Sequence, residues 1–375
     1  AREHRPMCAV SCRDDNAAAH PLRVRIYYVA TGRGLTKDAQ LLAAILGDQG
    51  MVVEIHEVNH VSVNPKGLYE KASRWLYRRS WLRFEAWLTR IEQWLIGTDR
   101  HPPVDIAIHL ERVFRQKLGT ATTHIFIPNQ EWFPPEQRRL LNLIDLIACK
   151  SRHGLAAFKQ LLPFHRAIVY TGFSTLAPPV VWQEPPFDCL HIAGQSPLKG
   201  TQAVVAVWQR HPEWPVLHLV TDLAVTAEAA NIRCHRALNA AAIADLRAQC
   251  LIAVQPSEVE GYGHVLAEPM TAAGVVVTTD GPPMNELVQP GRGFLVRYGQ
   301  QRPLRVGTCY RVDEAALEAV LERLFATPVD ELRRVGEAAQ RWQQAAHQQF
   351  ASQLVAVVRQ AAVNARRWEE TNDNG

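Results

Sequence analysis

The chain has 375 residues, 47% of them hydrophobic, and this size and composition favour two globular domains with a core each. Its formal net charge of +4 is mildly basic, which suits anionic ligands without requiring a nucleic acid. No apolar run reaches membrane-spanning length and no signal peptide is evident, and the 7 cysteines are scattered as in reduced proteins. We therefore expect a cytoplasmic protein, either free or peripheral to a membrane.

The N-terminal part of the chain is typical of the start of a Rossmann-like domain. Residues 1–21 are polar and aperiodic, which predicts a flexible tail. A strand is then predicted at 24–29, a tight loop with Gly32 follows, and helical spacing covers 36–46. A Rossmann-like half begins with strand, glycine loop and helix in this order, and the Gly-x-Gly alone is weak evidence for a nucleotide. Another strand is predicted at 52–56.

Residues 66–100 interleave aromatic and basic side chains, among them Trp75, Arg78, Trp81 and Arg83. One interpretation is an amphipathic helix that docks on an anionic membrane surface or on an anionic acceptor. The other is a helix that packs its aromatic stripe on the domain core and shows its arginines to water. The residue types suit both.

Two further buried strands, predicted at 104–111 and 124–133, end in polar residues. In an open parallel sheet, ligands bind at the carboxyl ends of the strands. We therefore expect a cleft here, and its acceptor-side candidates are His109, Glu111 and Glu131. Either Asn129 or Glu131 binds a sugar or acceptor hydroxyl, or the pair forms only a structural turn.

The second half of the chain repeats the strand–helix pattern, which predicts a second parallel sheet with helices on both faces. Strands predicted at 143–149 and 167–173 complete the first domain, and the strands of the second are predicted at 189–193, 216–220, 250–254 and 275–279. Helices are predicted at 202–210, 240–248, 265–273 and over much of 313–358. The predicted division is a tail at 1–21, a Rossmann-like domain at 22–176, a proline-rich linker at 177–188, a second Rossmann-like domain at 189–345 and a C-terminal helix at 346–375.

The most informative segment is 256–268, where Glu260 and Glu268 flank a Gly-x-Gly loop. Glycines let backbone N–H groups approach an anion closely, and the start of the following helix favours negative charge. The segment therefore predicts a phosphate seat. One turn into the helix, Glu268 is placed to accept both hydroxyls of a ribose, and Glu260 faces the group at the other end of the diphosphate.

The ordered set Pro-Ser, Glu-Gly-Tyr-Gly, Glu, Ala-Gly and three valines, at 256–277, resembles the E-x7-E signature of retaining GT-B glycosyltransferases, glycosyltransferase family 4-like (glycosyl transferases group 1). The resemblance implies an α/β fold of two Rossmann-like domains whose parallel sheets face a central cleft, with 22–176 as the acceptor domain and 189–345 as the nucleotide-sugar domain. It also implies a C-terminal helix that crosses back onto the N-terminal domain.

The segment 190–200 resembles the loop that opens the family's C-terminal domain. In the family, a basic residue after the first glycine and a lysine before the last glycine grip the donor diphosphate. Lys199 matches the lysine, whereas Gln195 stands at the first basic position and brings no charge. Asn129 stands where many members carry a histidine, so that histidine's role is not transferred.

The resemblance implies transfer of a sugar from a nucleoside diphosphate sugar to an acceptor hydroxyl, with retention at the anomeric carbon. The catalytic set is then Lys199, Glu260, Gln195 and Asn129. The donor-binding set is Glu268, Gly263, His264, Gly32, Gly194 and Gly281. No metal ligand is expected, because the chain contains no Asp-x-Asp triplet and a lysine with a helix dipole replaces the cation.

No cofactor is expected beyond the nucleotide sugar itself, with UDP or GDP as its carrier. The acceptor stays open among a lipid-linked saccharide, a glycan, a small metabolite, a protein and modified DNA. Two alternatives share the fold: a nucleotide-sugar 2-epimerase, and a degenerate nucleotide-binding module without turnover. Gln195 and Asn129 motivate the second of these.

Overall fold

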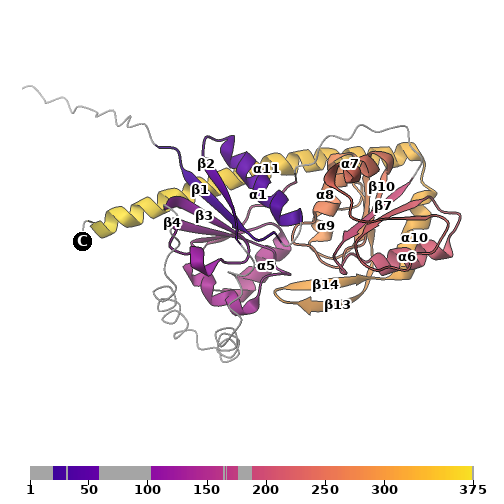
Figure 1. The fold of residues 1–375 in the computed structure, drawn as a ribbon, viewed down its shortest axis with the longest axis horizontal. Helices are drawn as coiled ribbons and strands as arrows, with labels where there is room; N and C mark the ends of the chain where they lie inside the picture. The colour runs from indigo at the N-terminus through magenta and orange to yellow at the C-terminus, as the bar shows by residue number, and fades with distance from the viewer. Residues whose placement is uncertain are drawn as a thin grey trace, which may run out of the picture.

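The computed structural model describes residues 20–30, 33–58, 103–163, 165, 167–175 and 188–373. The predictions for residues 66–100 and for Gly32 lie outside these ranges, as do almost all of the tail and the linker. Figure 1 shows two sheets side by side, with a long C-terminal helix running past both. Within the described ranges, no helix is both long enough and apolar enough to cross a membrane.

The first sheet has six parallel strands, as its predominantly apolar segments predict. In spatial order they are β2 (Val52–Glu57), β1 (Arg23–Tyr28), β3 (Val104–Glu111), β4 (Ala121–Pro128), β5 (Leu146–Cys149) and β6 (Ile168–Tyr170). Its main helices are α1 (Arg33–Gly47) and α5 (Arg152–Leu161), and short 3-10 turns lie at Arg115–Lys117 and Pro135–Leu143. The strand order reverses between β1 and β3, which makes this the point where a ligand is expected.

The predicted strand at 124–133 is too long at its C-terminal end. The strand β4 ends at Pro128, and the N–H groups of Trp132 and Phe133 both donate to the carbonyl oxygen of Asn129. These bonds close a turn, so Asn129 and Glu131 lie on the loop that follows the strand.

The second sheet is also six-stranded and parallel. In spatial order its strands are β12 (Phe294–Val296), β11 (Val275–Thr279), β10 (Ile252–Gln255), β7 (Cys189–Gly194), β8 (Leu217–Thr221) and β9 (Ile232–His235). Its helices are α6 (Thr201–Arg210), α7 (Ala240–Gln249), α8 (His264–Thr271), α9 (Met284–Leu287) and α10 (Glu314–Phe325). Here the order reverses between β7 and β10.

A two-stranded hairpin, β13 (Tyr298–Leu304) and β14 (Gly307–Val312), follows the second sheet and was not predicted. The first of these strands is polar and contains Pro303, both of which argue against a strand in sequence. The hairpin reaches the first domain. Arg305 donates a hydrogen bond to the carbonyl of Trp132, and Val306 packs against a hydrophobic cluster of the first domain.

The 45-residue helix α11 (Val329–Asp373) connects the two domains. It is about 68 Å long at the usual rise per residue. It contacts α8 and β11 of the second domain and α1, β3 and β4 of the first. Phe350, Leu354 and Val358 belong to one hydrophobic cluster that contains residues of both domains. The predicted crossing helix is therefore present, and it runs unbroken through the expected boundary at residue 345.

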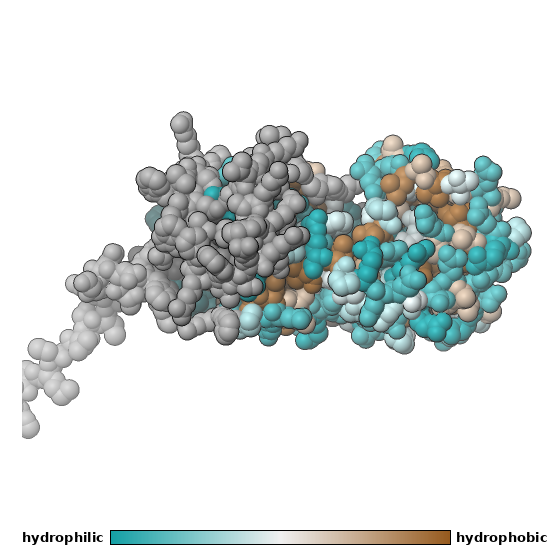
Figure 2. Space-filling model, turned by 90° about the horizontal axis from the view of Figure 1, so that it is seen from below, coloured by the Kyte–Doolittle hydropathy of each residue, from teal (hydrophilic) through white to brown (hydrophobic). Residues whose placement is uncertain are grey.

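The second domain combines a mostly polar lower face with an aromatic cluster in a largely aliphatic core. Figure 2 shows mostly hydrophilic residues on the described part of its lower face. Inside, the fully buried Trp208 meets Trp214 and Phe325 edge to face, with ring centroids 5.3 Å and 6.1 Å away. These aromatic contacts hold α6 against α10.

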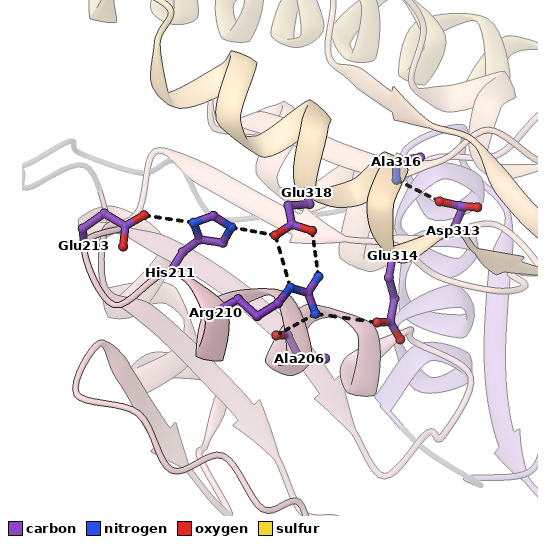
Figure 3. Close-up of polar contacts among 8 residues, drawn as sticks. All are labelled: Ala206, Arg210, His211, Glu213, Asp313, Glu314, Ala316 and Glu318. Carbon is purple, nitrogen blue, oxygen red and sulfur yellow. Dashed lines mark hydrogen bonds and ion pairs between the residues drawn. The ribbon is translucent and has the colours of Figure 1, made fainter.

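A polar cluster joins α6 and α10 at the surface (Figure 3). Arg210 donates to Glu318 through two nitrogens, at 3.2 Å and 2.8 Å, and His211 Nε2 lies 2.7 Å from the same carboxylate. The hydrogen bond from Arg210, with a second from His211, lowers the pKa of Glu318 to about 2. Glu318, together with Glu213, raises the pKa of His211.

The substitution Gly336→Ala is expected to lower the free energy of unfolding by about 1–3 kcal/mol. A Cβ at this position of α11 would lie 1.9 Å from the carbonyl oxygen of Ala273, so the helix would have to move. Gly47→Ala is the matched control, since a Cβ there meets no atom within 4 Å. Chemical denaturation measures both, and equal stabilities would contradict the close approach of α11.

The His211–Glu318 pair is expected to make thermal stability depend on pH. The pKa of His211 is raised, so its contribution is complete below 6.5 and is lost as the pH rises through the raised value. Compared with wild type, His211→Gln should therefore lower Tm by roughly 1–2 °C at pH 6, because the pair is near the surface, and by less at pH 9. Thermal unfolding across this range measures it. A difference independent of pH would show that the pair contributes nothing.

Candidate donor and acceptor site between the domains

Two loops meet at the point where the strand order of the second sheet reverses. One follows β7 and contains Lys199, and the other follows β10 and contains Glu260. The N–H of Glu258 donates to the carbonyl of Leu198 at 2.9 Å and ties the loops together. Gly200 has φ +70°, and a Cβ there would lie 2.4 Å from the carbonyl oxygen of Pro256. Glycine is therefore required for the two loops to come this close.

Lys199 and Glu260 form an ion pair at this junction. Their side chains are 15% and 10% exposed, so the pair is mostly buried but still accessible. Gln195 is exposed, and the carbonyl of Gly194 accepts the N–H of Asp222. Two predicted catalytic residues are thus in direct contact.

The helix α8 begins at His264, directly after Gly263, which has φ +106° and carries no capping side chain. The first-turn N–H groups of such a helix favour an anion. This is the geometry that the Gly-x-Gly segment predicts for a phosphate seat.

The ring of His264 is directed to the first domain. Its Nε2 donates to Asp38 of α1 at 2.7 Å, and its Nδ1 lies 2.8 Å from the hydroxyl of Thr175. Both ring nitrogens therefore have partners in the first domain. In this conformation the side chain joins the domains, while the backbone of His264 forms the start of α8, where the phosphate seat is predicted.

Asp38 is buried and is the centre of a charged network. Its second oxygen accepts from Lys150 at 2.5 Å, and Lys150 also donates to the side-chain oxygen of Asn129 at 2.9 Å. Burial alone would raise the pKa of Asp38, but Lys150 and His264 outweigh it and the pKa is lowered. Asn129 in turn donates to Glu111 at 3.2 Å. Two predicted residues, Asn129 and Glu111, are thereby brought together.

The turn 129–131 of the first domain packs directly on the glutamate motif of the second. Gln130 donates to the carbonyl of Glu260 at 2.9 Å. A Cβ at Gly261 would lie 2.4 Å from the side-chain oxygen of Asn129 and 2.9 Å from Glu131. The glycine after Glu260 thus lets the first domain approach.

Glu131 is an unusual carboxyl group at this contact. It is 2% exposed, and its Oε2 has no hydrogen-bond partner in the described structure. Burial, with a contribution from the charges of Glu260 and Glu111, raises the pKa of Glu131 to about 8. At neutral pH the group is therefore mainly protonated and can donate a hydrogen bond.

Glu268 is buried one turn into α8, and both of its carboxylate oxygens are ion-paired. One pairs with Lys37 of the first domain and the other with Arg247 of α7. The expected ribose contact of Glu268 stays a prediction.

Two predicted residues have other surroundings. Gly281 donates its N–H to the carbonyl of Thr279, and a Cβ there would lie 2.5 Å from Tyr310 of the hairpin. His109 is fully buried, and its two ring nitrogens contact His124 at 3.1 Å and the N–H of Phe114 at 3.2 Å. Burial, and then the charge of His124, lowers the pKa of His109 well below its usual value. In this conformation both residues serve the packing around the site.

Sequence reasoning missed four charged residues: Lys37, Asp38, Lys150 and Arg247. Lys150 had a usable signal, because it directly follows the strand β5, at the ligand-binding end of the sheet. The other three lie within helices and carry no local signal. In the described part of the chain, no group of three His, Cys, Asp or Glu side chains is placed to hold a metal ion.

Comparisons with known proteins place this geometry in a known fold. Residues 214–304 match the family described as Glycosyl transferases group 1. Sucrose-phosphate synthase from Thermosynechococcus elongatus is 14% identical and has a TM-score of 0.61, over 90% of this chain and 98% of its own. The catalytic domain of starch synthase IV from Arabidopsis thaliana is 12% identical, with a TM-score of 0.60 over 90% and 99%. The chain has the GT-B fold.

The Anabaena protein HepE is another GT-B structure of this shape, at 14% identity and a TM-score of 0.58 over 92% of this chain and 100% of its own. No curated protein matches the chain. In this protein, the region that matches the family, 214–304, contains Arg247, Glu260 and Glu268. Lys199 lies before this region. The family match and the fold together support a glycosyltransferase.

The substitution Glu131→Gln is expected to stabilise the protein at pH 8 and to be neutral at pH 4.5. Because the pKa of Glu131 rises from 4.5 to about 8 on folding, the wild type loses stability as the pH rises between these values. The amide mimics the protonated acid and removes this loss. We expect a Tm gain of about 3 °C or more at pH 8, measured by thermal unfolding. An equal effect at both pH values would mean that Glu131 ionises freely.

Proposed function

We propose that this protein transfers a sugar from a nucleoside diphosphate sugar to an acceptor hydroxyl, with retention of configuration and without a metal ion. The observation that carries the proposal is the Lys199–Glu260 pair beside the uncapped start of α8, at the strand reversal of the second sheet. HepE has been crystallised with UDP-glucose and with UDP and glucose, and starch synthase IV with ADP and acarbose. These complexes support a nucleotide-sugar donor here.

The reaction requires stabilisation of the departing diphosphate and a fixed approach of the acceptor. The bond between the anomeric carbon and the diphosphate oxygen breaks, and the acceptor oxygen forms its bond on the same face. The acceptor proton passes to the departing phosphate. Lys199 and the N–H groups at Gly263 and His264 stabilise the negative charge, which helps the leaving group depart.

The sugar is held by residues of both domains. Glu260 accepts hydrogen bonds from sugar hydroxyls once its pairing with Lys199 loosens. Asn129 and the protonated Glu131 lie against Gly261 from the other domain, where they bind a hydroxyl of the sugar or of the acceptor. Glu268 binds the ribose. We propose UDP or GDP as the carrier, and the acceptor stays open among the classes named above.

Gln195 favours one competing function, a nucleotide-binding module without turnover. Its side chain is exposed and uncharged, whereas the family has a basic residue at this position. A nucleotide-sugar 2-epimerase would share the donor site and would form product from donor alone. Turnover that requires an acceptor separates transfer from both alternatives.

The test begins with calorimetric binding of UDP, GDP, ADP, dTDP and CMP and their common sugars. One diphosphate should bind the wild type and bind Glu268→Gln more weakly. With that donor, Lys199→Ala should reduce turnover, including slow donor hydrolysis, by roughly a hundredfold or more, because it removes a charge that stabilises the leaving group. Lys159→Ala, an exposed lysine of α5, is the control. Absence of binding by the whole panel would overturn the proposed function.

A further inference from the structure

Two cations occupy the carboxylate of Glu268, which is the group proposed to bind the ribose of the donor. Its side chain is 3% exposed and each oxygen has its own cation, Lys37 or Arg247. A ribose that binds both oxygens has to take the place of at least one cation. The displaced cation then returns to water or pairs with another negative group, and a bound anion close by favours pairing.

Lys37 is the cation that can move. Its side chain is 37% exposed, whereas that of Arg247 is 12% exposed. A lysine has a flexible stem and a compact charge that suits phosphate oxygens without a fixed geometry. Lys37 also belongs to the first domain, so it can leave Glu268 without changing the second.

The start of α8 is the nearest place for a new negative group. Lys37 and Asp38 are neighbours on α1, and they pair with Glu268 and His264, which are four residues apart on α8. The four-residue spacing corresponds to about 6 Å along the axis of α8, a distance that a lysine side chain can span. The phosphate seat is at that end of the helix.

The charges around the proposed donor site also favour a contact between Lys37 and the diphosphate. Lys37, Arg247 and Lys199 face two carboxylates, Glu260 and Glu268, so one positive charge is in excess. Gln195 adds none. A diphosphate at the start of α8 would be left with Lys199 alone if no other cation reached it.

We propose that Lys37 is a donor-binding residue contributed by the first domain, which neutralises the donor diphosphate in place of the basic side chain missing at position 195. The ribose displaces it from Glu268, and it then pairs with a phosphate oxygen. This assignment rests on the proposed function. Binding of the nucleotide sugar to the second domain thereby creates an ion pair with Lys37 of the first domain.

The test compares UDP, GDP and ADP with uridine, guanosine and adenosine by calorimetry. Lys37→Ala should weaken the diphosphate that binds the wild type by roughly tenfold to a hundredfold. Binding of the matching nucleoside should be unchanged or tighter, because the ribose no longer competes with Lys37. Lys37→Arg should retain most of the diphosphate affinity, and Gln195→Arg should restore it in the Lys37→Ala background. Lys159→Ala is the matched control, and thermal unfolding verifies the fold of each variant.

Three results would overturn the assignment. Equal losses for nucleoside and diphosphate would give Lys37 a purely structural role, and tighter binding of both would make it only a competitor of the ribose. No loss in Lys37→Ala would remove it from the site. If the wild type itself binds none of the diphosphates, the proposed function is wrong and the assignment falls with it, which distinguishes that failure from the other three.

Discussion

The carboxylate of Asp38 is the group on which the geometry of the site depends. Burying a charge is tolerated only when partners and hydrogen bonds compensate for the lost water, and here Lys150 and His264 do so. His264 comes from the second domain, so the compensation requires the two domains to meet. Removing one partner would leave a buried charge, at a cost of about 3–5 kcal/mol. The network thus fixes the start of α8 relative to the first domain.

The other contacts between the domains surround this centre and use different kinds of interaction. The carboxylate of Glu286 accepts the N–H groups of Arg152 and His153, both at 2.7 Å, and so occupies the N-terminus of α5 from the second domain. The hairpin meets Trp132 on another side, and α11 shares its apolar face with both cores. The polar contacts come from the helices α1, α8 and α9 and from the turn 129–131, while α11 adds its apolar face. Different elements therefore make the two kinds of contact.

The features that could be predicted from the sequence are those with a local pattern of residues, namely most strands and the loops that follow them. Buried apolar runs gave the strands of both sheets except β9 and β12, whose side chains are only partly buried. The loop with Glu260 was found from its Gly-x-Gly segment, and the loop with Lys199 from its resemblance to the family's loop. Asp38 and Lys37 were missed because their partners His264 and Glu268 are 226 and 231 residues away, and a charged residue on a helix usually faces water. The hairpin was missed because its stability comes from the domain it touches. Contacts between residues so far apart produce no periodic pattern in the sequence from which they could be predicted.

The surroundings of two carboxyl groups near the cleft shift their pKa values in opposite directions. Asp38 keeps its charge because Lys150 and His264 face it, whereas Glu131 is buried near other carboxylates and holds a proton up to about pH 8. Such a separation gives one site both an acceptor and a donor of hydrogen bonds at neutral pH. A protonated Glu131 can donate a hydrogen bond to a hydroxyl oxygen, whereas a carboxylate can only accept one from the hydroxyl group. Because Gly261 lies against it, any movement of the motif loop that admits water would lower this pKa and remove the donor. The hydrogen-bonding character of the site is therefore coupled to the closeness of the two domains.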